Sequence, residues 1–172
     1  MMSDFFIKLL DSRERRFQYQ QTLINKYKRP IISYMLNIPG KVKRTDEYVV
    51  FHKMGIELIK SILGNKILVD EYYDEDTGMY YLAAVNQDAI ELKKQMMELE
   101  DSVEGRLFDI DVFDENAKQI TRSSLNLEPR KCLLCSEMAK ACARNQTHPY
   151  EELIEETNKI INDFINKNLQ RI

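Results

Sequence analysis

The sequence lacks the features that would place it in a membrane, in a secretory pathway or among fibrous and disordered proteins. Its apolar runs are only a few residues long, whereas a transmembrane helix needs roughly 20 apolar residues. The opening stretch, MMSDFFIKLLDSRERR, has neither the basic start nor the cleavage site of a signal peptide. Glycine and proline are few, with 5 and 4 in 172 residues, which excludes collagen-like and low-complexity chains. We therefore expect a soluble, cytoplasmic protein without a membrane partner.

Cysteine is also scarce, and neither sign of charge dominates. Three cysteines are an odd count, and in a reducing compartment they are more often metal ligands or buried thiols than disulfides. The net charge of −3 gives no indication of nucleic-acid binding. A chain of 172 residues with 44% hydrophobic side chains is long enough to form its own core. We expect one domain, 1–172, with an N-terminal helical segment (1–29), a Cys/His loop (130–148) and a C-terminal helix (149–172).

The hydrophobic spacing predicts alternating helices and strands. The expected elements are an N-terminal helix broken once at an Asp11–Glu14 capping box, a strand from 31 that ends at Pro39-Gly40, a helix capped by Asp46, a hairpin over 66–85, a helix capped by Asn86, strands over 105–113 and 119–122, and a helix starting at His148-Pro149. The series thus reads β-α-β-β-α-β between about 31 and 113.

That order is typical of the ferredoxin-like fold, an α+β architecture, here with an added strand and with helices at both ends. A nucleotidyltransferase-like α/β core, in which a strand also bears Asp-x-Asp, is the alternative. In the ferredoxin-like topology the first and last core strands lie side by side and antiparallel. The end of LNIPG would therefore meet the beginning of GRLFD, which joins two distant segments in one site.

Two aspartates, Asp109 and Asp111, interrupt the apolar strand GRLFDIDVF. Side chains alternate across a strand, so Phe108, Ile110 and Val112 face one side, while Leu107, Asp109, Asp111 and Phe113 face the other. Residues two apart on one face are about 7 Å apart, which lets two carboxylates converge on one Mg²⁺ or Mn²⁺. The alternative is a solvated strand face, because Asp-x-Asp is a short and common pattern.

Several cationic side chains have spacings that suit phosphate binding. Arg13, Arg16 and Gln20 share one helix face, Lys41, Lys43 and Arg44 follow the Pro-Gly turn, and Arg106 precedes the aspartate strand. Arginine binds phosphate with two parallel hydrogen bonds. Taken singly, each of these groups more often forms the solvated side of a helix or loop.

The segment after residue 129 contains all three cysteines. Cys132, Cys135, Cys142 and His148 follow the pattern C-x₂-C-x₆-C-x₅-H, with zinc-type ligands in a loop that has little apolar content. This pattern matches none of the common zinc-finger spacings. Structural Zn²⁺, buried thiols and a catalytic thiol all remain open interpretations.

The motifs LNIPG with Lys43, GRLFDIDV and PRKCLLC…AKACAR…H, together with the opening SRERRFQYQQTLINKY, occur in this order along the chain. In this respect the sequence resembles the apo-citrate lyase phosphoribosyl-dephospho-CoA transferases, also called holo-citrate lyase acyl-carrier-protein synthases. The resemblance covers nearly the whole chain. It implies that 2′-(5″-triphosphoribosyl)-3′-dephospho-CoA donates its phosphoribosyl-dephospho-CoA part to a serine of the apo acyl carrier protein, the γ chain of citrate lyase, with release of diphosphate.

With this chemistry implied, motif position and strand adjacency suggest roles for individual residues. We expect Asp109 and Asp111 to hold Mg²⁺, and one of them to accept the serine proton. The expected catalytic set is Asp109, Asp111 and Arg106, with Arg106 also expected to contact the triphosphate. The expected substrate-binding residues are Arg13, Arg16, Gln20, Asn37, Gly40, Lys43, Arg130 and Arg144.

The carrier partner should meet a basic surface beside the cysteines. Acyl carrier proteins are usually acidic, so Arg130, Lys131, Lys140 and Arg144 are expected to steer it by charge. Two other functions fit the same residues. One is a non-enzymatic carrier-binding module with a zinc-ordered docking loop, and the other is a 4′-phosphopantetheinyl transferase that uses CoA.

Overall fold

Five strands form one antiparallel sheet in the order β2-β3-β1-β4-β5. The computed structural model describes residues 4–169. Its strands are β1 (Ile31–Leu36), β2 (Ile67–Glu75), β3 (Gly78–Val85), β4 (Phe108–Phe113) and β5 (Gln119–Ile120). Its helices are α1 (Asp4–Tyr27), α2 (Asp46–Leu63), α3 (Ala89–Asp101), α4 (Ala139–Asn145) and α5 (Tyr150–Leu169). The α+β class is therefore confirmed.

The predicted adjacency of the first and last core strands is also confirmed. Strands β1 and β4 pair antiparallel, with Leu36 opposite Phe108. One step further along, the amide of Asn37 donates a hydrogen bond of 2.8 Å to the carbonyl of Leu107. The LNIPG segment and the start of the aspartate strand therefore lie next to each other.

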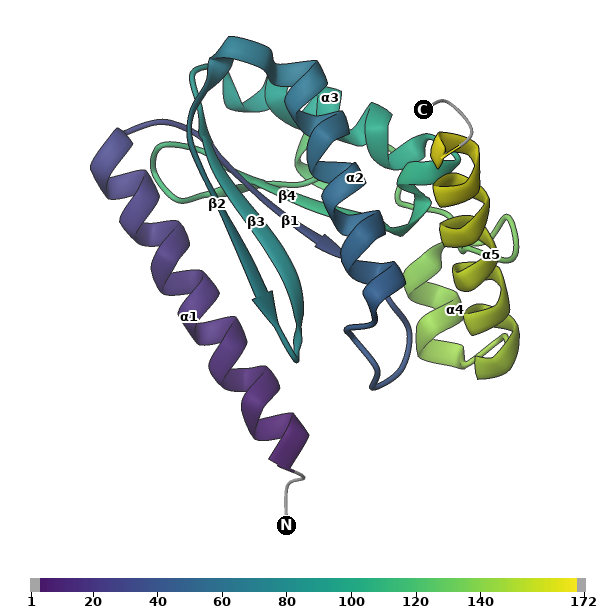
Figure 1. Ribbon diagram of the computed structural model, residues 1–172. Helices are drawn as coiled ribbons and strands as arrows, with labels where there is room; N and C mark the ends of the chain where they lie inside the picture. The colour runs from purple at the N-terminus through teal and green to yellow at the C-terminus, as the bar shows by residue number, and fades with distance from the viewer. Residues whose placement is uncertain (1–3, 170–172) are drawn as a thin grey trace.

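The helices divide unequally between the two faces of the sheet (Figure 1). Helices α2, α3 and α5 cover the face that bears Tyr34, Phe108 and Ile110, and this layer forms the larger core. Helix α1 lies on the opposite face, where Leu23 and Ile24 pack beside the sheet residues Ile31, Leu82 and Ala84. The aspartate face of β4 is thus the face that α1 crosses.

Helix α1 is continuous, so the predicted break at Asp11 and Glu14 is wrong. A capping box needs its first residue outside the helical conformation, whereas Asp11 lies within the helix. The predicted cap of α2 is off by one residue, because the hydroxyl of Thr45, rather than Asp46, accepts the amide of Tyr48. The cap of α3 is Asp88, whose carboxylate accepts two amides, and not Asn86.

The chain after β4 also differs from expectation. Strand β5 ends at Ile120 and does not reach 122, because the amide of Thr121 binds the hydroxyl of Ser124 and a short 3₁₀ turn follows. The segment 130–148 contains helix α4 and is not only a loop. Leu107 is buried in the larger core, since it belongs to the 3₁₀ turn before β4 and does not follow the strand alternation.

Gly55 in α2 is expected to tolerate no side chain. A β-carbon at this position would lie 2.1 Å from the hydroxyl oxygen of Tyr34, a residue with no exposed surface. The Tyr34 ring is itself held between His52, 4.4 Å away, and Phe108, 5.1 Å away. We expect Gly55→Ala to lower the free energy of unfolding by about 1–3 kcal/mol, despite the better helix propensity of alanine. Denaturant unfolding measures this.

Ser61→Ala, on the exposed side of the same helix, is the matched control. Its stability should change by no more than about 0.5 kcal/mol. A Gly55→Ala protein as stable as the unmodified chain would contradict the close packing of α2 on Tyr34.

Candidate functional site

Strand β4 places Asp109 and Asp111 on the face of the sheet that α1 crosses. Phe108, Ile110 and Val112 have no exposed surface, whereas the side chain of Asp109 is 54% exposed and Asp111 is half-buried. In the β1–β4 pairing Asp109 lies opposite Met35, and Asp111 lies opposite Ser33. The predicted division of this strand into an apolar face and an acidic face is therefore confirmed.

The interface between α1 and the sheet changes from apolar to polar along the helix. Near its C-terminal end, Leu23 and Ile24 are buried against the sheet. In the middle of the helix the buried or half-buried residues are Ser12, Arg16 and Gln20, which are all polar, whereas the half-buried Phe5 and Leu9 nearer the N-terminus are apolar. Helix α1 leads directly into β1, and β1 runs back along the helix. This polar part of α1 therefore lies over the end of the sheet where β1 finishes (Figure 1).

Arg16 brings positive charge to the two aspartates. Its guanidinium carbon lies 5.7 Å from the centre of the Tyr80 ring, in a cation–π contact. Burial and the neighbouring charge of Arg13 lower the pKa of Arg16, while Asp111 and Asp109 act in the opposite direction. Arg13, Arg16, Asp109 and Asp111 therefore belong to one electrostatic neighbourhood, which joins the start of the chain to β4.

Asp111 has an environment different from that of an ordinary surface carboxylate. Burial raises its pKa, and the nearby charge of Asp109 raises it further, against the opposing effects of Lys93 and of a hydrogen bond from Gln119. The Gln119 amide donates that bond to Oδ1 of Asp111 at 2.7 Å. Gln119 was missed from the sequence, where nothing distinguishes it from other polar residues near a turn.

The oxygen donors at this place fit a hard divalent cation. Two carboxylates lie one strand repeat apart on the same face, and Ser33 is opposite Asp111 on the neighbouring strand. Oxygen ligands of this kind suit Mg²⁺ or Mn²⁺. The mutual repulsion that raises the pKa of Asp111 is what a bound cation would relieve.

Arg106 and Arg130 fasten β4 to the cysteine segment. Arg130 donates to the carbonyls of Phe108 and Arg106, at 2.8 Å each. Arg106 donates to the carbonyls of Cys132, at 2.6 Å, and Lys131, at 3.2 Å. These contacts give both arginines a positioning role, although Arg130 also lies 3.9 Å from the Asp109 carboxylate.

Two buried charged side chains bind the backbone of β4 at Ile110, and neither was identified from the sequence. Glu100 accepts the amide of Ile110 at 2.8 Å, and Lys93 donates to the carbonyl of the same residue at 2.8 Å. Side chains thus provide the hydrogen bonds that a neighbouring strand would otherwise supply. Because these partners come from α3, no local sequence signal marks them.

The predicted phosphate ligands after β1 are only partly available. The ammonium group of Lys43 donates to the carbonyl of Ile38, and burial lowers the pKa of Lys43. Gly40 has a positive φ of 79°. A β-carbon there would lie 1.9 Å from the Tyr150 hydroxyl oxygen, so this glycine allows the loop to lie against the start of α5. Asn37 is exposed and lines a cavity beside the cysteine segment.

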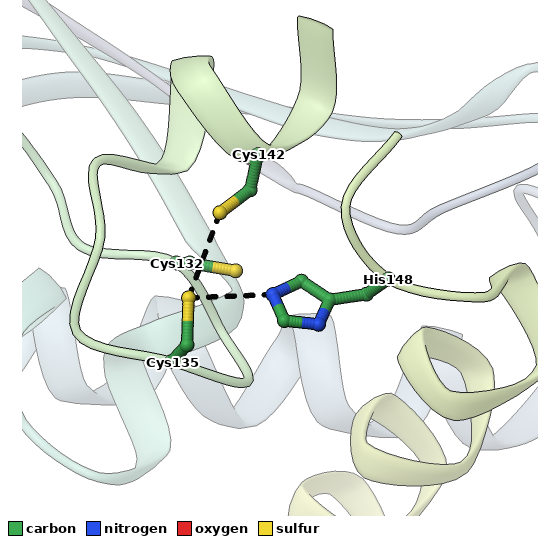
Figure 2. Close-up of side chains that lie close together, drawn as sticks. All are labelled: Cys132, Cys135, Cys142 and His148. Atoms are coloured by element: carbon green, nitrogen blue, oxygen red, sulfur yellow. Dashed lines mark hydrogen bonds between the residues drawn. The ribbon is translucent and has the colours of Figure 1, made fainter. Parts of the chain in front are cut away.

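The four residues of the Cys/His pattern come together in space. Figure 2 shows Cys132 and Cys135 on the loop before α4, Cys142 on α4, and His148 on the loop before α5. Their potential ligand atoms all lie within 4.8 Å of one another. The Cys135 sulfur is 3.5 Å from the Cys142 sulfur and 3.3 Å from Nε2 of His148. Tetrahedral ligands at a zinc–sulfur distance of about 2.3 Å would lie about 3.8 Å apart.

The backbone around these residues forms a small turn. The amide of Cys132 donates to the carbonyl of Glu137 at 2.7 Å, and Lys131 pairs with Met138. Burial and contact with the other two cysteines raise the pKa of Cys142 to about 11, whereas the backbone amides of Leu134 and Cys135 help to lower that of Cys132 despite its burial. The cluster can hold a metal ion such as zinc.

The predicted basic surface beside the cysteines is smaller than expected. Lys131, Lys140 and Arg144 are exposed, but Arg130 is half-buried and engaged with β4. In residues 4–169, no helix combines the length and the apolar character needed to cross a membrane.

Comparison with known proteins gives one consistent result. Residues 6–164 match the family described as apo-citrate lyase phosphoribosyl-dephospho-CoA transferase. A probable transferase of that name from Streptococcus pyogenes serotype M18 is 31% identical over 168 residues, which cover 94% of this chain and 88% of the relative. A transferase of the same name from Shigella boydii serotype 18 is 29% identical over 160 residues, covering 91% and 87%.

A longer relative is the protein named CitXG from Leuconostoc mesenteroides subsp. cremoris. It is 32% identical over 164 residues, which cover 92% of this chain. The aligned part makes up 35% of that protein, so this chain spans about a third of its length.

Proposed function

The chain belongs to the apo-citrate lyase phosphoribosyl-dephospho-CoA transferase family, and from this premise we propose that it attaches the prosthetic group of citrate lyase. The donor is 2′-(5″-triphosphoribosyl)-3′-dephospho-CoA. The acceptor is a serine of the apo acyl carrier protein, the γ chain of citrate lyase, and the second product is diphosphate. The structural observation that carries the proposal is the position of Arg16 of α1 over the Tyr80 ring, because Met35, which lies opposite Tyr80 in β3, also lies opposite Asp109 in β4.

The reaction replaces one phosphorus–oxygen bond with another. The serine oxygen attacks the α-phosphorus of the donor, the bond from this phosphorus to the bridging oxygen breaks, and diphosphate leaves. The serine proton needs an acceptor, and we assign it to Asp111, whose pKa is raised by burial and by Asp109. A raised pKa makes a carboxylate a better base while it is still ionised near neutral pH.

The triphosphate requires positive charge on more than one side. Mg²⁺ held by Asp109 and Asp111 would neutralise charge on the phosphates as the transfer proceeds. Arg16, with its planar guanidinium over the Tyr80 ring, would bind phosphate oxygens from the α1 side, and Arg13 would extend this contact. Gln119 keeps the Asp111 carboxylate oriented toward the substrate.

The Cys/His cluster serves in this proposal as a structural zinc site, and not as a source of nucleophiles. Arg106 links the cluster to the beginning of β4 through two backbone carbonyls. Ordering of this segment therefore positions the exposed Lys131, Lys140 and Arg144 beside the site, where they would steer an acidic carrier. The cluster thiols stay reduced in the cytoplasm, which is where we place the reaction.

Intact-mass spectrometry of the carrier tests this function. The protein, Mg²⁺ and apo carrier are incubated with the triphosphoribosyl donor, with CoA, or with neither. We expect the mass of phosphoribosyl-dephospho-CoA to be added only with the donor. A phosphopantetheine mass with CoA would identify a 4′-phosphopantetheinyl transferase, and an unmodified carrier in every arm would leave only a carrier-binding role.

Arg16→Lys should separate charge from geometry at the triphosphate. Lysine keeps the charge but loses the two-pronged hydrogen bonding of arginine. We expect KM for the donor to rise about tenfold, which corresponds to about 1.4 kcal/mol of lost binding, with a smaller change in kcat. Steady-state kinetics with varied donor concentration measure both constants.

Arg15→Lys is the matched control on the same helix. Arg15 points to Glu75, with 2.8 Å between Nη2 and the carboxylate oxygen, and not to the aspartates. Its KM should stay within twofold of that of the unmodified protein. Equal effects of the two substitutions would contradict a specific phosphate contact at Arg16.

A further inference from the structure

A cavity of about 810 Å³ lies beyond the end of β1. One wall is the loop after β1, with Asn37 and Pro39, and the other is the cysteine segment with the start of α5, including His148, Pro149, Tyr150 and Leu153. Its size is within the usual 300–1,000 Å³ of small-molecule sites. Cys132, Cys142 and His148 of the Cys/His cluster border this cavity, but the steps proposed above for phosphate and serine use none of its space.

The lining of this cavity is mostly apolar, with polar groups at a few places. Pro39, Pro149 and Leu153 supply apolar surface, and Tyr150 supplies an aromatic ring. Within residues 4–169, the side-chain amide of Asn37 and the side-chain hydroxyl of Tyr150 make no hydrogen bond. Both are therefore available to a ligand. A flat heteroaromatic group with polar edges has the matching chemistry.

The position of the Tyr150 ring is fixed by the loop opposite. Gly40 packs so closely that a β-carbon would lie 1.9 Å from the Tyr150 hydroxyl oxygen and 2.6 Å from the adjoining ring carbon. Only glycine leaves room for the ring, and the φ of 79° at this residue also favours glycine. The ring is held as a platform beside Pro39, although Tyr150 as a whole is 48% exposed.

The cavity begins close to Asp109, the nearer of the two aspartates. Met35 lies opposite Asp109 in the sheet, and the amide of Asn37 continues the same ladder. Asn37 is two residues beyond Met35, so the two α-carbons are about 7 Å apart along the strand. A ligand that reaches both the carboxylate of Asp109 and the cavity at Asn37 needs an aromatic group roughly 10 Å from its phosphates.

We propose that this cavity binds the adenine base of the donor, with the ring on Tyr150 and the polar edge toward Asn37. The inference rests on the proposed function and assigns a second half to the same site. In the donor, two ribose rings separate the α-phosphorus from adenine, a path of about ten bonds that spans roughly 10 Å. An asparagine amide can form two hydrogen bonds with the adenine edge, and aromatic side chains stack on bases.

The same chemistry disfavours the pantetheine arm as the occupant. Pantetheine is a flexible chain without a flat ring, so it gains nothing from an aromatic platform and loses more conformational freedom on binding. A base, in contrast, is rigid and presents both an apolar face and a polar edge. The pantetheine arm is then expected to extend into solvent, away from the reaction.

Ligand-observed NMR with adenosine and pantetheine as separate probes tests the proposal on the complete chain. Adenosine should bind saturably, and Tyr150→Ala should weaken it at least tenfold, while Tyr150→Phe keeps the ring and most of the affinity. Asn37→Ala should reduce the preference for adenosine over inosine severalfold. Tyr72→Ala, at a tyrosine on β2 outside the cavity, is the matched control and should bind adenosine normally.

Several results would overturn the assignment. Adenosine that fails to saturate, or that binds Tyr150→Ala as well as the unmodified protein, would exclude the base from the cavity. Pantetheine that binds and is lost in Tyr150→Ala would assign the cavity to the other end of the donor. Thermal melting of each variant establishes that it is folded.

The transfer reaction provides an independent readout. Carrier modification with an unchanged donor KM in Tyr150→Ala would refute the cavity assignment and leave the proposed function intact. Normal adenosine binding with no modification of the carrier in any arm would refute the proposed function and leave the cavity assignment intact. The two proposals therefore fail separately.

Discussion

Replacement of both aspartates, in an Asp109→Asn/Asp111→Asn protein, should reduce the rate of prosthetic-group transfer by at least about 10³-fold. The two carboxylates have two proposed roles: together they hold the cation, and one of them accepts the serine proton. Asparagine has nearly the same shape but carries no charge and is a poor base. Asp111→Asn alone should lose about 10²–10⁴-fold, because it also removes the proposed base.

Single-turnover kinetics with saturating donor and apo carrier measure this loss. Asp163→Asn, at an exposed position of α5, is the matched control and should transfer at the normal rate. Melting curves distinguish a catalytic effect from unfolding. Relief of repulsion between the two carboxylates should make the double variant at least as stable as the unmodified protein.

The pH dependence gives this prediction a second readout. The base must be ionised, so activity falls as pH drops through the pKa of Asp111. In the metal-free protein burial and Asp109 raise that pKa above its ordinary value, so at limiting Mg²⁺ the acid limb of the rate profile should lie at a higher pH than for a solvated aspartate, and saturating Mg²⁺ should move it to lower pH. Asp109→Asn removes one cause of the raised pKa of Asp111. The acid limb of its residual rate profile, measured under the same conditions, should therefore lie at lower pH. A limb that stays in place would contradict the assignment.

Loss of the metal from the Cys/His cluster should have the largest effect on stability. The segment around Cys132, Cys135 and Cys142 has few buried apolar side chains, so we expect its order to depend on a metal held by the cluster. We expect Cys135→Ser to abolish stoichiometric zinc binding and to lower the free energy of unfolding by about 3 kcal/mol, a fall of roughly 6–12 °C in Tm. Elemental analysis and calorimetry measure the two effects.

Glu137→Gln, in the same loop but with an exposed side chain outside the cluster, is the control. Its zinc content and Tm should match those of the unmodified protein. A strong chelator should reproduce the effect of Cys135→Ser, and acid should promote metal release because the thiols must be deprotonated to bind. Metal-free protein with an unchanged melting curve would show that the cysteines are simply buried thiols.

The sequence contains enough information for the parts of the site that depend on a single element. Alternation along β4 separated Phe108 and Ile110 from Asp109 and Asp111, because a strand has a fixed two-residue period. The order of strands and helices similarly predicted that β1 and β4 are neighbours. The C-x₂-C-x₆-C-x₅-H spacing identified four residues that do meet in the fold.

The parts that depend on contacts between distant elements could not be derived from the sequence. Arg106 and Arg130 were expected at phosphate or carrier, yet each donates to backbone carbonyls that only the folded chain brings near. Lys43 was expected to face phosphate and instead donates to Ile38. Gln119 reaches Asp111 because β5 returns along β4, and polar residues near a turn give no sign of such pairing.

One titration tests whether α1 and β4 form a single site for a divalent cation and a triphosphate. Inorganic tripolyphosphate is titrated into the protein by calorimetry, with and without Mg²⁺. Mg²⁺ should strengthen binding to the unmodified protein and to Asp163→Asn but not to Asp109→Asn/Asp111→Asn, and Arg16→Lys should weaken binding about tenfold in the presence of Mg²⁺. The same Mg²⁺-dependent affinity in the unmodified protein and in the double aspartate variant would contradict the proposed site.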